Sequence, residues 1–183
     1  MSKLAVLFPG IGYHKDKPLL YYSMKIAKEA GYQPVYIDFS SIAWDKADLR
    51  DPEKMKELFI QATGVTENVF SDVHITAGDE VLFISKSIGT AVAAYYAEMN
   101  GLKAKQIYFS PVVQFGGFAG DYGLAFYGDN DPLADHTKIE EICVEKKIEA
   151  HLIAGANHSL EIGDTETDLI NLTKMMSLVK TFI

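Results

Sequence analysis

Cysteine is almost absent from this chain: its 183 residues include one, Cys143. A single thiol excludes a disulfide within the chain and a metal site built from several thiolates. The segment around Cys143 has a helical pattern, so we expect a small, buried side chain there. A sequence so poor in cysteine is typical of a reducing compartment, and we expect a cytoplasmic protein.

Positive charge and long apolar runs are also scarce. The chain has 17 Lys and Arg against 25 Asp and Glu, a formal net charge of −8, and its basic residues are scattered. Such a surface repels phosphate backbones and anionic lipids, so nucleic acid and membranes are not expected partners. The opening run "KLAVLF" stops at Pro9 and Gly10, far short of the roughly 20 residues that span a bilayer.

Motifs for metals and phosphate loops are missing as well. The sequence contains no HExxH, no paired metal motif and no GxxxxGK[ST], so neither a metal nor another cofactor is expected. There is no internal repeat, low-complexity tract or linker. With 48% hydrophobic residues, the chain is long enough to bury one substantial core, and we expect residues 1–183 to form a single domain.

Short apolar runs alternate with amphipathic segments along the chain. The runs are rich in Val, Ile, Phe and Tyr and are predicted to be buried strands at residues 3–8, 33–39, 80–85, 105–110, 123–128 and 149–154. Helical patterns lie at 17–32, 51–63, 88–99 and 169–179. The alternation predicts an α/β protein, a three-layer α/β/α sandwich on a mainly parallel sheet of about six strands.

Polar residues follow several of the expected strands, where ligands of such sheets bind. The third strand ends in "SKSIG", the fifth in "YGDNDP" and the sixth in "GANHS". Ser87 lies where a strand turns directly into a helix, which holds the turn residue in a strained backbone and raises its side chain. Ser85 and Gly89 flank it, giving a GxSxG pattern whose first glycine is replaced by serine.

These residues resemble the α/β-hydrolase superfamily, specifically small members without a cap, similar to dienelactone hydrolases and short esterases. The resemblance spans nearly the whole chain. It implies a nucleophile at Ser87, an acid at Asp131 and a base at His158. In such a triad the imidazole removes the serine proton during attack, and the carboxylate stabilises the imidazolium. We expect a carboxylic-ester hydrolase for small acyl substrates that works through an acyl-enzyme; thioesters and lactones stay open.

The resemblance also implies an oxyanion hole. Its first half is the backbone N–H of Ile88, and its second half comes from the loop after the first strand, at Ile11 or Gly12. Asp129 is a rival for the acid, and Ser85 raises the question of crowding at the turn. Lys86 is expected to point away from the nucleophile as a surface charge.

Substrate contacts are predicted in two loops. The glycine-rich linker 111–123 contains Phe115 and Phe118, which we expect on a mobile, aromatic wall of a shallow pocket, with Tyr13 and His14 opposite. If His158 is the base, activity should fall below a pH near ~6.5 as the ring takes a proton.

Alternative roles for these residues stay open. Ser87 and Asp131 could be ordinary helix N-caps, and His158 could bond a loop carbonyl. The first strand is followed by Gly10-x-Gly12, and Asp38 ends the second, a partial dinucleotide fingerprint in which Lys15 replaces the third glycine. A hydrolase-like scaffold that binds a ligand without turning it over is a further alternative.

Overall fold

Six parallel strands form the centre of the molecule. A computed structural model describes residues 2–45, 49 and 51–183. The strands are β1 (Lys3–Phe8), β2 (Gln33–Tyr36), β3 (Glu80–Lys86), β4 (Ala104–Phe109), β5 (Leu124–Gly128) and β6 (Glu149–Ile153). Their order across the sheet is β2-β1-β3-β4-β5-β6, and every neighbouring pair is parallel. The predicted α/β class and six-strand parallel sheet are confirmed.

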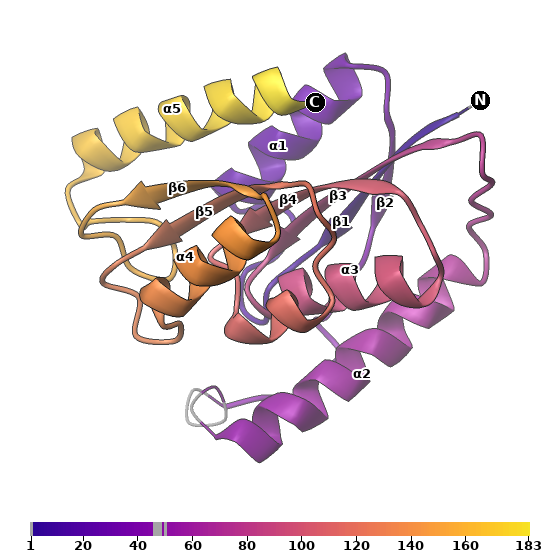
Figure 1. The fold of residues 1–183 in the computed structure, drawn as a ribbon, viewed down its shortest axis with the longest axis horizontal. Helices are drawn as coiled ribbons and strands as arrows, with labels where there is room; N and C mark the ends of the chain where they lie inside the picture. Colours follow the sequence, from indigo (N-terminus) through magenta and orange to yellow (C-terminus); the bar gives the residue numbers. More distant parts are fainter. Residues whose placement is uncertain (1, 46–48, 50) are drawn as a thin grey trace.

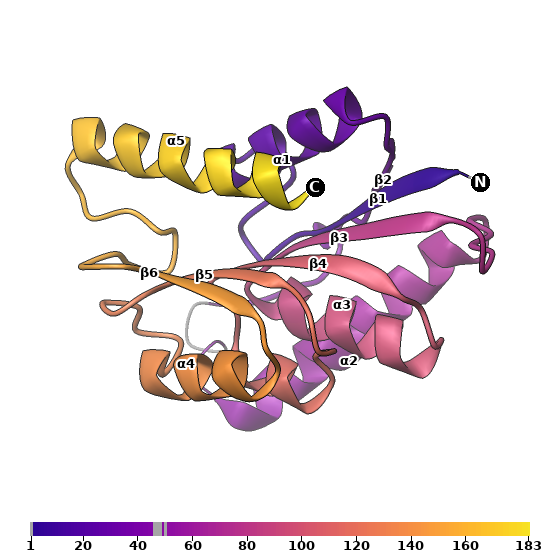
Figure 2. The same ribbon diagram turned by 45° about the horizontal axis from the view of Figure 1, so that its top comes forward.

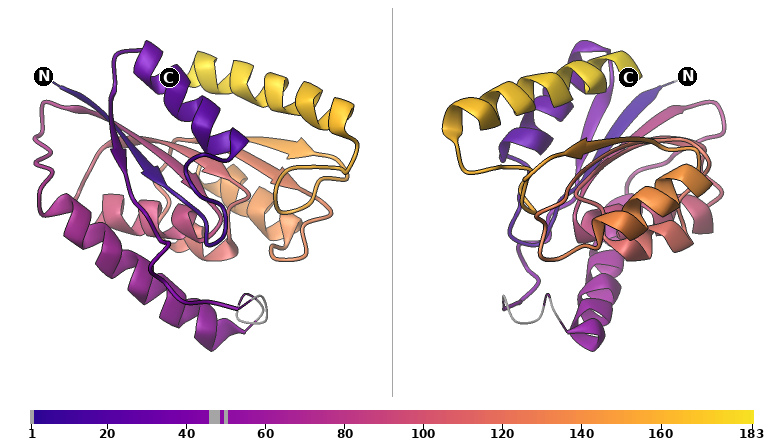
Figure 3. Two further views of the ribbon diagram at one scale, coloured as in Figure 1. Left: turned by 180° about the vertical axis from the view of Figure 1, so that it is seen from behind. Right: turned by 60° about the vertical axis from the view of Figure 1, so that its left-hand side comes forward.

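Helices cover both faces of this sheet (Figure 1). They are α1 (Pro18–Glu29), α2 (Pro52–Phe70), α3 (Ile88–Met99), α4 (His136–Glu145) and α5 (Thr165–Phe182), with a short 3-10 helix η2 (Val113–Gly117). α1 and α5 lie together on one face, and α2, α3 and α4 lie on the other, which Figures 2 and 3 show from further directions. The result is the predicted three-layer sandwich.

Alternation along the strands explains why both faces need cover. In β1, Ala5 and Leu7 pack in the core under α1 and α5, whereas Val6 and Phe8 pack under α2 and α3. All four side chains are fully buried. A strand with apolar residues on both faces is stable only in the middle of such a sandwich.

α2 is longer than the sequence pattern predicted, since it runs to Phe70 and not to residue 63. Gly64 in its interior weakens the helical signal. The helix continues because Leu58, Ala62 and Phe70 stay buried along one stripe, and the hydroxyl of Thr66 bonds back to the Ala62 carbonyl. Burial against the sheet therefore outweighs local propensity here.

The sheet has its switch point between β1 and β3. These neighbouring strands continue into helices on opposite faces, α1 after β1 and α3 after β3, and ligands of such sheets bind where the connections diverge in this way. Ser87 and the loop that begins at Pro9 lie at this point. Within the described residues, no helix is long and apolar enough to cross a membrane.

Candidate active site

The turn from β3 into α3 places Ser87 in a strained conformation. Its φ of 56° and ψ of −128° lie in a region that side-chain-bearing residues rarely adopt, at a cost of about 1–3 kcal/mol. Three hydrogen bonds hold it: its N–H donates to the Phe109 carbonyl, and its own carbonyl accepts from the N–H and the hydroxyl of Thr90. Ser87 makes no side-chain cap bond to α3, so it is not an ordinary N-cap.

Two glycines make room for this turn. A Cβ on Gly89 would lie 2.4 Å from the Pro9 carbonyl oxygen and 2.6 Å from that of Phe8, so α3 can approach β1 only because glycine is there. A Cβ on Gly10 would lie 3.1 Å from the Cβ of Ser87. Ser85, in place of the usual first glycine, does not crowd the turn, because its hydroxyl donates to the Ile107 carbonyl on β4 at 2.8 Å.

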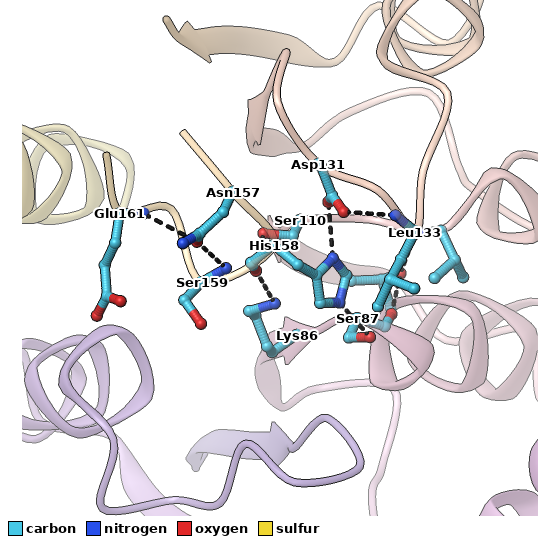
Figure 4. A network of polar contacts seen from close by, with 11 residues as sticks. Lys86, Ser87, Ser110, Asp131, Leu133, Asn157, His158, Ser159 and Glu161 are labelled. Atoms are coloured by element: carbon cyan, nitrogen blue, oxygen red, sulfur yellow. Dashed lines mark hydrogen bonds and ion pairs between the residues drawn. The ribbon is translucent and has the colours of Figure 1, made fainter. Parts of the chain in front are cut away.

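Ser87, His158 and Asp131 form one hydrogen-bonded line (Figure 4). The Nε2 of His158 lies 2.7 Å from the Oγ of Ser87, and its Nδ1 lies 2.6 Å from a carboxylate oxygen of Asp131. The Asp131 side chain is 2% exposed and that of His158 is 21% exposed. Asp129 does not reach His158; its carboxylate accepts from the N–H of Gly155. Of the two candidate acids, only Asp131 meets the ring.

The loops that carry the acid and the imidazole pack against each other. A Cβ on Gly128 would lie 2.1 Å from the Ala156 carbonyl oxygen, so β5 and the loop after β6 touch backbone to backbone. The Asn130 N–H donates to the same carbonyl. In the second loop the Asn157 side chain accepts from the N–H of Ser159 at 2.7 Å, which orders the chain around His158.

The prediction that Lys86 is a surface charge is wrong. Lys86 is fully buried, and its ammonium donates to the backbone carbonyl of His158 at 2.6 Å. The Ser110 hydroxyl donates to the same carbonyl at 2.9 Å. The expected surface charge is therefore an internal one, because the His158 loop and the Tyr13 ring lie over the end of β3.

Burial dominates the electrostatics of this cluster. It lowers the pKa of Lys86 to about 7, against a smaller opposing effect of Asp131. Burial also lowers the pKa of His158, the charge of Lys86 lowers it further, and the bond to Asp131 opposes both. A ring whose pKa lies below its ordinary value is neutral at neutral pH, the form that can accept a proton.

Backbone N–H groups without an acceptor lie in the two segments that meet at Ser87, the start of α3 and the turn after β1. Within the described residues, the N–H groups of Ile88, Ile11 and Gly12 have no protein acceptor. Ile88 is the first residue of α3, so its N–H lies at the positive end of the helix dipole. Ile11 and Gly12 form a tight turn closed by two bonds between Gly10 and Tyr13, and Gly12 has a φ of +78°. The turn lies against Ser87 through Gly10.

The predicted substrate contacts are only partly accessible. Phe115 is fully buried and packs on Tyr108 at a centroid distance of 5.0 Å, so its prediction as a pocket wall is wrong. It lies within η2, where the chain turns its aromatic ring into the core. Phe118 does line a cleft. Tyr13 faces Lys86 instead, and His14 is exposed beside Asp16.

Two cavities flank the turn at Ser87. One, about 180 Å³, has a mainly apolar lining that includes Ile88, the residue after Ser87; it consists of Pro52, Met55, Lys56, Phe59, Ile88, Ala91, Val112, Gln114 and Phe118. The other, about 470 Å³, is more polar and includes Gly10, Gly12 and His14 together with Trp44. No local sequence pattern marks the first, because its wall combines α2, α3 and η2.

The dinucleotide alternative finds no support in the loop after β1. α1 begins only at Pro18, so residues 9–17 separate it from the strand, and its N-cap Lys17 makes no side-chain cap bond. A dinucleotide site needs the helix to start directly at the glycine turn, so that its N–H groups face the pyrophosphate. Among the described residues, no group of three or more His, Cys, Asp or Glu could hold a metal ion.

Solved structures share this fold. No family model and no curated protein matches the chain. Est1E from Butyrivibrio proteoclasticus superposes with a TM-score of 0.68 at 12% identity, over 99% of this chain and 86% of that one. XC6422 from Xanthomonas campestris, an α/β serine hydrolase without lid, gives 0.65 at 14% identity, over 98% and 80%. The Pyrococcus furiosus esterase Pf2001 gives 0.68 at 11%, over 99% and 80%. The chain therefore has the α/β-hydrolase fold, and the described residues include no separate lid.

Proposed function

We propose that this protein is a serine hydrolase that cleaves carboxylic esters of small acyl groups through an acyl-enzyme. The observation that carries the proposal is the line Ser87–His158–Asp131, with separations of 2.7 Å and 2.6 Å, beside N–H groups that have no protein acceptor within the described residues. The esterases that share the fold support it by analogy.

Acylation follows from this geometry. With its Nδ1–H donated to Asp131, the neutral ring of His158 accepts the Ser87 proton at Nε2 while the Oγ attacks the acyl carbonyl carbon. The carbonyl π-electrons move to its oxygen, where the N–H groups of Ile88 and of Ile11 or Gly12 stabilise the negative charge. When the tetrahedral adduct collapses, the C–O bond to the alcohol breaks and His158 returns the proton to the leaving oxygen.

Deacylation repeats these steps with water. His158 takes a proton from a water molecule, and the resulting hydroxide attacks the acyl carbonyl carbon held on Ser87. The bond to Oγ then breaks, Ser87 recovers its proton from His158, and the carboxylic acid leaves. The neutral ring that burial favours is the form required at the start of both half-reactions.

The apolar cleft supports a small acyl group as the substrate class. Ile88 links the cleft to the nucleophile, since it follows Ser87 directly in the chain and its side chain lines the wall. Phe118 stacks on Phe59 at a centroid distance of 6.4 Å and forms another part of the lining. A cleft of about 180 Å³ suits a short apolar chain and is too small for a long fatty acyl chain.

Covalent labelling tests this proposal. Incubation with a small fluorophosphonate, followed by intact mass spectrometry, should give one adduct on the wild type and none on Ser87→Ala, because only a serine activated by His158 attacks the phosphorus. Ser85→Ala is the matched control: it removes a neighbouring hydroxyl that already donates to Ile107 and should still be labelled.

The wild type should then hydrolyse short-chain esters in a substrate screen, and Ser87→Ala should lose that activity. Absence of the adduct from folded wild type would contradict the proposal and favour a scaffold that binds its ligand without turnover.

A further inference from the structure

Lys86 is a buried charge that the proposed reaction does not consume. It is the last residue of β3, one residue before Ser87, and its side chain is fully buried. Holding an ammonium group in a protein interior is costly unless it meets compensating partners. The partners that Lys86 meets belong to the loops on either side of Ser87, so the charge links two parts of the candidate site.

The first partner is the loop of the imidazole. The Nζ of Lys86 donates to the His158 carbonyl oxygen at 2.6 Å, and Ser110, at the end of β4, donates to the same oxygen at 2.9 Å (Figure 4). Fixing this carbonyl fixes the backbone from which the His158 ring projects. The ring is then held in the orientation in which it bonds both Ser87 and Asp131.

The second partner is the turn after β1. The Nζ of Lys86 lies 5.1 Å from the centroid of the Tyr13 ring, within the range of a cation–π interaction. Tyr13 closes the Gly10–Tyr13 turn through two backbone bonds, and its hydroxyl accepts from the N–H of Leu19. The turn that offers the N–H groups of Ile11 and Gly12 is therefore tied to Lys86 as well.

We propose that Lys86 is a positioning residue that holds the His158 loop and the Gly10–Tyr13 turn in place on opposite sides of Ser87. The proposal rests on the function proposed above, and it adds a residue that acts through the imidazole and the oxyanion turn. A neutral side chain of the same length would fill the space but leave the His158 carbonyl with one donor and the Tyr13 ring with no cation.

After burial, which is the larger cause, the charge of Lys86 also lowers the pKa of His158. The titratable groups that face this cluster are Asp131, His158 and Tyr13, with Glu161 acting on Tyr13. Burial raises the pKa of Tyr13 to about 12, so it stays a neutral phenol at working pH. Charged Lys86 lowers the pKa of His158, so removing the charge should raise it and move the acid limb of the activity to higher pH.

The experiment compares Lys86→Met with Ser110→Ala. Both remove a donor from the His158 carbonyl, but only Lys86→Met removes a charge. Lys86→Met should slow fluorophosphonate labelling by about ten- to a hundredfold, the loss expected of a small misplacement, and should shift the acid limb of kcat/KM to higher pH. Ser110→Ala should leave the acid limb in place. The melting temperature of Lys86→Met should change little, because the lost bond to the His158 carbonyl and the removed cost of burying an ammonium group act in opposite directions.

Titration of the His158 ring by NMR separates this proposal from the proposed function. Its resonance is assigned by its loss in His158→Gln, and its midpoint should rise in Lys86→Met even if the wild type proves to be no hydrolase. If the wild type is labelled and Lys86→Met shows the same labelling rate and the same acid limb, the role proposed for Lys86 is overturned while the proposed function stands.

Should Lys86→Met fail to fold, the wild type still decides. Because burial lowers the pKa of Lys86, the wild-type His158 resonance should show a second inflection when Lys86 loses its proton. A resonance with no second inflection over the whole pH range in which the protein stays folded would overturn the proposal, because the ring must sense the charge of a group bonded to its own backbone.

Discussion

Asp129 and Asp131 lie two residues apart in one loop, but their carboxylates have different hydrogen-bond partners. The Asp131 carboxylate is 2% exposed and accepts from the Leu133 N–H with one oxygen while the other meets His158. Asp129 is exposed and accepts from the Gly155 N–H. Burial and the bond from the Leu133 N–H fix the Asp131 carboxylate, so it is the group able to hold an imidazolium in place.

At this scale we predict opposite results for two matched substitutions. Asp131→Asn should lower kcat by about a thousandfold or more, because an amide no longer holds the Nδ1–H tautomer and stabilises no imidazolium. Asp129→Asn keeps an oxygen that can accept from Gly155 and should change kcat little. Steady-state kinetics on a short-chain ester measure both, and equal losses in the two variants would refute the assignment.

Single residues also show how much of the candidate site could be predicted from the sequence. Ser87, Asp131 and His158 were named from the ends of strands, and they do meet in the structure, although their catalytic role stays a prediction. The burial of Lys86 was not foreseen, because its partner lies 72 residues away and nothing near it in the sequence marks that contact. The inward ring of Phe115 likewise depends on the turn of η2.

At the scale of elements, the contact between α3 and β1 depends on one missing side chain. Gly89 lies in the first turn of α3, where a Cβ would meet the Phe8 and Pro9 carbonyls. Gly64 lies inside α2, and a Cβ there would meet nothing within 4 Å. The two glycines are therefore opposite cases, one required by packing and the other a local weakness in a helix.

Alanine substitutions at these two positions should change the free energy of unfolding in opposite directions. Gly89→Ala should destabilise the protein by about 1–3 kcal/mol, since α3 must move away from β1. Gly64→Ala should stabilise it by about 0.5–1 kcal/mol, because alanine loses less backbone freedom in a helix. Urea unfolding followed by circular dichroism gives both values. A destabilised Gly64→Ala or an unaffected Gly89→Ala would contradict these assignments.

The elements themselves were largely predictable from the sequence. All six strands were expected near their observed positions, because a short apolar run rich in β-branched and aromatic residues is typical of a strand buried on both faces. The end of α2 was placed seven residues early, at 63 instead of Phe70. Local propensity at Gly64 predicted an end, and burial of the following stripe against the sheet overrode it.

At the scale of the whole molecule, the fold leaves its candidate site open. Within the described residues the α/β-hydrolase fold has no separate lid, and Ser87 lies at the switch point between β1 and β3, where Gly10 and Ile88 each line a cavity. A covering lid would have to move before substrate could enter, and an oil–water interface could drive that movement. The described part of this chain includes no separate segment that would have to make this movement.

We therefore predict simple saturation kinetics. The rate with a short-chain ester should rise hyperbolically with concentration and show no jump when the substrate passes its solubility limit. A pH-stat assay across that limit measures this, and a sharp rise above it would point to a covering segment. A dodecanoyl ester should be a poorer substrate than a butanoyl ester, since the apolar cleft is about 180 Å³.

The all-parallel sheet, finally, makes the candidate site a late product of folding. Parallel neighbours cannot pair through tight hairpins, so each pairing waits for a long crossover to close. Ser87 and His158 stand 71 residues apart, and His158 follows the last strand. A nascent chain that ends before β6 contains the nucleophile without its base, so reactivity toward a fluorophosphonate would appear only with the finished sheet. In a refolding experiment, the rate at which labelling appears would thus measure the rate at which the native state forms.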